Sequence, residues 1–97
     1  MAKVDKIKSI LTKKKPFLVK KYKIKALGIF GSYVRREETK RSDLDLLVEF
    51  QESPGFLEFI EIENYLTDTL GIKVDLVMKS ALKPRIGQHI LNEVEYL

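Results

Sequence analysis

The 97-residue sequence predicts an α/β fold, in which a small mixed sheet of three or four strands carries helices packed on it. Three short segments have the apolar content, the alternation or the flanking turn residues of strands: Ile24 to Phe30, Ser42 to Phe50, and Lys73 to Met78. The segments around them have the spacing or the start and stop residues of helices, which we expect over 3–13, 16–22, 32–38, 56–70 and after Lys83. The hydrophobic content of 44% suffices for one small core, so we expect residues 1–97 to form a single domain.

The N-terminal segment combines two predicted helices with a strong positive charge. Val4, Ile7 and Leu11 lie at helical spacing, whereas Pro16 suits the first turn of a second, short helix. Residues 1–25 carry ten lysines and one aspartate, and the rest of the chain has more acidic than basic residues. This basic segment is either a solvated helix face or a surface that attracts nucleic acid or an acidic partner.

One later segment has both the start and the stop signals of a helix. Ser53-Pro54-Gly55 suits a cap and first turn, and Gly71 suits the position after the last turn. Phe56, Phe59 and Leu66 lie between them at helical spacing. We expect this stripe to belong to the core and not to a cofactor site.

The composition excludes several classes of protein. The chain has no cysteine, so disulfides and thiolate metal sites are excluded, and its one histidine, His89, cannot form a histidine-rich zinc site. No apolar run approaches the roughly 18 residues of a membrane helix, and the N-terminus has no signal-peptide core. We therefore expect a cytoplasmic protein with no membrane association.

The residues with the most chemical character follow the first predicted strand. Gly31 and Ser32 leave that strand, and a glycine there lets the backbone turn and a ligand come close. Asp43 and Asp45 open the second predicted strand, where residues two apart point to the same face. Two neighbouring carboxylates repel each other unless a cation lies between them, and Mg²⁺ prefers carboxylate and phosphate oxygens. The stretch therefore predicts a phosphate-binding turn beside a carboxylate pair that holds metal.

A third acid, Asp75, lies inside the otherwise apolar third strand. An acidic side chain in such a strand is rarely left buried and unpaired. One explanation is an ion pair with Lys73 or with an arginine, and the other is a place in the acidic site.

Gly31-Ser32, Arg35 and Ser42-Asp43-Leu44-Asp45-Leu46 together resemble the signature of the polymerase-beta-like nucleotidyltransferases, and above all of their minimal, MNT-type members. The family pattern is Gly-Ser, then an arginine usually followed by glycine, then Ser-Asp-x-Asp at the start of the next strand. Arg36 stands here in place of that glycine. The resemblance covers roughly Lys25 to Val94 and implies a minimal polymerase-beta-like core. It also matches Asp75 to the third carboxylate that the family carries on the following strand.

The resemblance implies that the three acids carry nucleotidyl transfer from ATP with two Mg²⁺ ions. Asp43 and Asp45 would bridge the metals and the triphosphate. Asp75 would bind the metal at the attacking hydroxyl and could help to remove its proton.

The phosphates would be held by the turn and the arginine. Gly31 and Ser32 would bind the β- and γ-phosphates through backbone N–H and hydroxyl groups, unless Ser32 is only the N-cap of a short helix. Arg35 would either neutralise phosphate charge or brace the carboxylates as an ion pair.

The resemblance also implies a partner, because MNT-type proteins often pair with a HEPN-type ribonuclease toxin. Several act as antitoxins by transferring AMP from ATP to a tyrosine of that toxin, and this is the function we expect. Two alternatives stay open. One is nucleotidyl transfer to a small hydroxyl compound, such as an aminoglycoside, or to RNA. The other is a non-catalytic antitoxin that neutralises its partner by contact.

With apolar helices at both ends, the domain could also pair with a second copy of itself.

Overall fold

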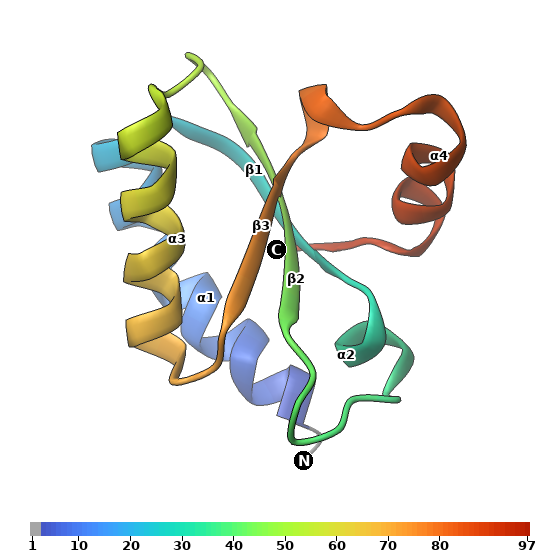
Figure 1. Cartoon of the computed structure of the whole chain (residues 1–97). Helices are drawn as coiled ribbons and strands as arrows, with labels where there is room; N and C mark the ends of the chain where they lie inside the picture. The colour runs from blue at the N-terminus through green and yellow to red at the C-terminus, as the bar shows by residue number, and fades with distance from the viewer. Residues whose placement is uncertain (1–2) are drawn as a thin grey trace.

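A four-stranded mixed sheet forms the centre of the molecule (Figure 1). The structure, a computed structural model, describes residues 3–97. In chain order the elements are α1 (Lys3–Tyr22), β1 (Ile24–Phe30), α2 (Ser32–Arg35), β2 (Leu44–Phe50), α3 (Phe56–Leu70), β3 (Val74–Met78), the 3₁₀ turn η1 (Lys79–Ala81), α4 (Pro84–Glu93) and β4 (Glu95–Tyr96). The strand order is β3-β2-β1-β4, with β1 antiparallel to both neighbours and β2 parallel to β3. The predicted α/β fold with a small mixed sheet is confirmed.

The two faces of the sheet have different roles. Helices α1 and α3 lie on one side, and α2 and α4 lie on the other (Figure 1). Leu44, Leu46 and Val48 of β2 point to the side of α1 and α3 and are almost fully buried. Because side chains alternate along a strand, Asp45 points to the opposite face, as its period-two spacing predicted. The core on the first side joins the two helices to the three long strands through Val4, Ile7, Leu11, Leu18, Tyr22, Ile24, Leu27, Ile29, Leu44, Leu46, Val48, Ile62, Leu66, Val74 and Leu76.

Helix α1 is one continuous helix, so the prediction of two helices separated at Pro16 is wrong. A proline inside a helix removes one backbone hydrogen bond and crowds the preceding turn. Here the apolar stripe continues on both sides of the proline, with Leu11 before it and Leu18 after it, both fully buried. Packing of this stripe on the sheet outweighs the cost of a proline inside the helix. The prediction from local sequence signals did not include this packing.

Helix α3 connects the parallel strands β2 and β3 and protects the outer edge of the sheet. The backbone N–H of Val74 donates to Thr67 Oγ1 (3.0 Å), and that of Leu76 donates to Glu63 Oε2 (2.8 Å). These bonds give edge-strand N–H groups a partner, which limits pairing with other chains. The helix ends at Gly71 in the left-handed conformation (φ 68°), as predicted.

The aromatic stripe of α3 is only partly a core feature. Ile62 and Leu66 are fully buried and Phe59 packs against the core, but Phe56 is 76% exposed. The expectation that the stripe belongs to the core is therefore wrong at its first residue, which lies in the first turn of the helix.

The C-terminal segment returns to the sheet and adds its fourth strand. Helix α4 begins with Pro84 at its first turn, where a proline is tolerated. Strand β4 then pairs with β1 through Gly28 and Ile29, and the N–H of Leu97 donates to the Leu27 carbonyl (2.9 Å). Gly28 permits this approach, because a Cβ there would lie 2.5 Å from Val94 Cγ2. The close pairing brings the end of α4 next to the end of β1.

Candidate active site

Two of the three predicted acids face each other across neighbouring strands. Asp45 of β2 and Asp75 of β3 are register partners in the parallel pair, so their side chains leave the same face of the sheet about one strand spacing apart. Asp43 lies just before β2, which begins at Leu44 and not at the predicted Ser42. The N–H of Leu44 donates to the Lys73 carbonyl (2.8 Å) and fixes this end of the strand pair. The structure therefore brings all three acids to one end of β2 and β3.

The electrostatics of this end of the sheet are unfavourable for Asp45. Partial burial, together with the negative charges of Asp75 and Asp43, raises the pKa of Asp45 to about 6 from an ordinary value of 3.8. Arg35 acts in the opposite direction, but its charge does not compensate. A carboxylate held with two others at a raised pKa is a group whose charged form a bound cation would stabilise.

The predicted ion pair between Lys73 and Asp75 is not the one observed. Lys73 Nζ lies 4.0 Å from Asp43 Oδ2, and both side chains are exposed. This loose surface pair contributes little to stability. Asp75 is exposed on the edge strand β3, so solvent access explains how an acid is tolerated in this strand.

Within residues 3–97, no three histidine, cysteine, aspartate or glutamate side chains converge into a ready-made coordination cluster. Mutual repulsion is the physical reason, since carboxylates that share a site separate unless a cation draws them together. The donor set still fits Mg²⁺, because three carboxylates from adjacent backbone positions supply the hard oxygen ligands that this ion takes.

Gly31 forms the turn directly opposite Asp45. It adopts φ 79° and ψ −154°, a region that only glycine occupies without strain. A Cβ at this position would collide with Asp45 Oδ2, so the turn and the carboxylate are in direct contact. Gly31, and not Ser32, is the N-cap residue of α2, and no side chain caps this helix. The interpretation of Ser32 as a helix cap is therefore wrong.

Helix α2 is a single turn and ends three residues earlier than predicted. Arg36, at the position where the family usually has glycine, adopts a left-handed conformation with φ 60° and closes the helix. Its guanidinium reaches Asp5 of α1 at 3.8 Å, and both groups are exposed. Arg36 thus takes the left-handed conformation that a glycine would adopt without strain, and this costs some backbone conformational energy.

Arg35 does not pair with the site acids. Its Nη1 donates to Glu93 Oε1 (2.7 Å), and its Nε lies 3.4 Å from Glu37 Oε2. Glu93 Oε2 also accepts the backbone N–H of Gly31 (2.8 Å). One carboxylate therefore joins the turn and the arginine.

Glu93 was not among the predicted site residues. It is the last residue of α4, where its sequence context is that of an ordinary surface glutamate. Only the pairing of β4 with β1 brings it to this place, and no local spacing reveals that pairing.

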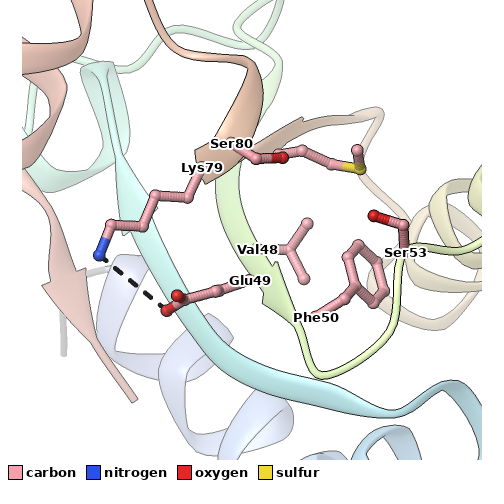
Figure 2. A pocket seen from close by; sticks show the side chains of 7 residues that line it. Val48, Glu49, Phe50, Ser53, Lys79 and Ser80 are labelled. Atoms are coloured by element: carbon pink, nitrogen blue, oxygen red, sulfur yellow. Dashed lines mark ion pairs between the residues drawn. The ribbon is translucent and has the colours of Figure 1, made fainter.

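A pocket lies at the other end of β2. It has a volume of about 380 Å³ and is lined by Val48, Glu49, Phe50, Ser53, Met78, Lys79 and Ser80. Figure 2 shows Glu49 beside Lys79, with their charged atoms 4.0 Å apart. This pocket contains none of the predicted site residues. His89 is exposed on α4 and does not line this pocket either.

Comparison with known proteins identifies the class. Residues 5–97 match the family model described as polymerase beta, nucleotidyltransferase. The chain therefore belongs to the polymerase beta nucleotidyltransferase family and is a nucleotidyltransferase. It is similar to the minimal members of that family, as the resemblance predicted.

Two of the similar relatives match over all or nearly all of their length. The protein adenylyltransferase MntA of Thermococcus cleftensis is 48% identical over 97 residues, which cover 100% of this chain and 98% of MntA. MJ0128 of Methanocaldococcus jannaschii, provisionally named a protein adenylyltransferase, is 52% identical over 98 residues. The alignment covers 100% of this chain and 100% of MJ0128.

Solved structures agree with the fold. A protein described provisionally as a minimal nucleotidyltransferase superposes with a TM-score of 0.76 at 30% identity, covering 94% of this chain and 95% of that one. A chain from a toxin–antitoxin structure with AMP-PNP gives a TM-score of 0.71 at 23% identity. The superposition covers 95% of this chain and 69% of that chain. No helix within residues 3–97 is long and apolar enough to span a membrane.

Proposed function

We propose that this protein transfers AMP from ATP to a hydroxyl of a partner protein in a Mg²⁺-dependent reaction. The acceptor is a tyrosine of a HEPN-type toxin, and the modification neutralises that toxin. The observation that carries the proposal is the register pairing of Asp45 and Asp75 beside the Gly31 turn. The names of the full-length relatives support a protein acceptor.

The reaction requires the acceptor oxygen to attack the α-phosphorus of ATP in line with the leaving group. A new phosphorus–oxygen bond forms, the bond to the β-phosphate oxygen breaks, and pyrophosphate leaves. Asp43 and Asp45 would hold the metal ions beside the triphosphate, and Asp75 would take up the proton of the acceptor hydroxyl. When bound, Mg²⁺ supplies charge stabilisation for the attacking and leaving oxygens.

The turn and the arginine hold the triphosphate on the other side of the acids. Ser32 offers its hydroxyl and backbone N–H to the β- and γ-phosphates. Gly31 contributes by having no side chain, which lets phosphate approach the backbone next to Asp45. Arg35 is exposed, and Glu93 accepts only one of its guanidinium N–H groups. The other N–H groups neutralise phosphate charge.

The test is transfer of label from ATP to a co-expressed HEPN partner in the presence of Mg²⁺. Label in the α-position should appear on the partner, and label in the γ-position should not, because the γ-phosphate leaves with pyrophosphate. The Asp43→Asn, Asp45→Asn double variant should give no transfer. Glu49→Gln is the matched control, since Glu49 lies on the same strand and faces the distant pocket.

Other outcomes would identify the alternatives. A tight complex that neutralises the partner equally in the parent and the double variant would show inhibition by contact alone. Label on RNA or on a small hydroxyl compound, with none on the partner, would show a different acceptor. Either result would refute the proposed function.

A further inference from the structure

We propose that Glu93 is a positioning residue of the nucleotide site, holding the Gly31 turn and Arg35 in the geometry that receives the triphosphate. The inference rests on the proposed function and adds a residue to it. It assigns a role to the C-terminal segment, whose docking on β1 completes the site.

The geometry of Glu93 is bidentate and joins two separate parts of the site. One carboxylate oxygen accepts the Gly31 N–H (2.8 Å), and the other accepts Arg35 Nη1 (2.7 Å). The Glu93 side chain is only 24% exposed, compared with 66% for Glu37, the other carboxylate near Arg35. Although partial burial alone would raise it, the pKa of Glu93 is lowered by the hydrogen bonds from Arg35 and Gly31. Glu93 is therefore held as a charged, oriented acceptor.

The turn needs such a support because its backbone N–H must have a hydrogen-bond acceptor. Gly31 lies at φ 79° and ψ −154°, where the chain turns away from the end of β1. The N–H of Gly31 has no strand or helix partner at this point, and Glu93 supplies its acceptor. Fixing this N–H also fixes the contact between Gly31 and Asp45.

The fold delivers Glu93 to this place through the fourth strand. Glu93 is followed by β4, in which Glu95 is the register partner of Ile29 and Tyr96 that of Gly28. Ion pairing of Glu95 with Lys8 of α1 adds a second attachment of β4 to the core. Since Ile29 is two residues before Gly31, the end of α4 must lie over the turn. The same pairing that closes the sheet therefore sets the position of the carboxylate.

The bonding pattern leaves the phosphate-facing groups free. Glu93 accepts the Gly31 N–H and one guanidinium N–H of Arg35, and it makes no hydrogen bond with Ser32. A bound triphosphate can thus be held by Ser32 and by the remaining guanidinium donors while Glu93 stays in place. The alternative, that Glu93 occupies a phosphate position and must be displaced, predicts the opposite effect on nucleotide affinity.

The experiment compares Glu93→Ala, Glu93→Gln and Glu37→Ala with the parent. It measures the affinity for a non-hydrolysable ATP analogue with Mg²⁺ by calorimetry, and kcat and KM for transfer to the partner. Glu93→Ala should weaken analogue binding and lower kcat/KM by about 10- to 100-fold, as the loss of a supporting carboxylate typically does. Glu93→Gln keeps an oxygen for the Gly31 N–H and should recover part of the loss. Glu37→Ala, which removes the other carboxylate near Arg35, should match the parent.

The outcomes separate this inference from the proposed function. If the parent binds the analogue but transfers nothing, the proposed function fails, and weaker binding by Glu93→Ala still supports the positioning role. If Glu93→Ala remains folded and binds the analogue as tightly as the parent or more tightly, with undiminished transfer, the positioning role is wrong. If the parent neither binds the analogue nor transfers AMP, both are wrong.

Discussion

Replacing Asp45 by asparagine should stabilise the metal-free protein at neutral pH, although it should abolish transfer. The folded state places the Asp45 carboxylate in a partly buried position next to Asp75 and Asp43, which raises its pKa to about 6 from 3.8. A raised pKa of an acid means that its charged form destabilises the fold. Asparagine has nearly the same shape and carries no charge, so the variant removes this destabilisation.

The magnitude follows from the size of the pKa shift. Each pKa unit corresponds to about 1.4 kcal/mol, so the full shift would be worth about 3 kcal/mol. Asp45 is only partly buried, and solvent screening reduces this to about 1–2 kcal/mol. Since 1 kcal/mol shifts Tm by about 4–8 °C in a domain of this size, we expect Asp45→Asn to raise Tm by about 5–10 °C.

The gain should depend on pH in a defined direction. The folded protein holds the Asp45 proton more tightly than the unfolded chain, so the contribution of this group to stability is fully present below about pH 4 and is lost as the pH rises through about 6. Asp45→Asn has no proton to lose here. Its advantage should be complete above about pH 6 and absent near pH 4.

The assay is thermal unfolding with EDTA at about pH 7.5 and about pH 4, followed by circular dichroism. Glu49→Gln serves as the control for removing one acid from the same strand. Equal Tm values for the parent and Asp45→Asn at the higher pH would refute the electrostatic reasoning. So would a gain that persists unchanged at the lower pH, because it would have a cause other than charge.

Three further perturbations test other parts of the structure. Gly31→Ala should unfold at lower denaturant concentration and lose analogue binding, because its Cβ would collide with Asp45. Gly71→Ala has a similar φ but open space around it, so its free energy of unfolding should fall by only about 1 kcal/mol and analogue binding should be kept. Pro16→Ala should raise the free energy of unfolding by about 2–3 kcal/mol in urea titrations, and an unchanged midpoint would contradict the cost assigned to this proline. Mg²⁺ with the ATP analogue should raise the Tm of the parent, reversibly with EDTA, but not that of the Asp43→Asn, Asp45→Asn variant.

The parts of the fold that depend on neighbouring residues could be predicted from the sequence. Strand β1 begins and ends where its apolar run and turn residues indicated, and α3 stops at Gly71 as expected. The placement of Asp43 and Asp45 followed from period-two alternation, which is a local property. The meeting of Asp45 with Asp75 required only that the second and third long strands be parallel neighbours.

The errors arise where contacts between distant segments override local signals. Pro16 is a strong helix signal, but the buried stripe of α1 on the sheet outweighs it. Phe56 fits the periodicity of α3, yet its side chain is largely exposed in the first turn of that helix. Arg36 ends α2 by adopting a conformation that its residue type disfavours.

Glu93 illustrates the limit most clearly, because its contacts depend on tertiary structure alone. It is separated from Gly31 by 62 positions and from Arg35 by 58. Its approach depends on Gly28, whose missing Cβ lets β4 pair closely with β1. A glycine in the middle of an apolar strand is typical of a place where another backbone approaches closely, but the residue does not identify the approaching segment.

The central claim is that the acids of β2 and β3 and the Gly31–Ser32 turn form one metal–nucleotide site. The most direct test uses Mn²⁺ in place of Mg²⁺, with the ATP analogue, and measures paramagnetic broadening of backbone amide signals by NMR. Broadening should begin at Gly31, Ser32, Asp45 and Asp75 and spread outward from them. Broadening centred on Glu49 and the pocket at the other end of β2, or none at all, would contradict the assignment of the site.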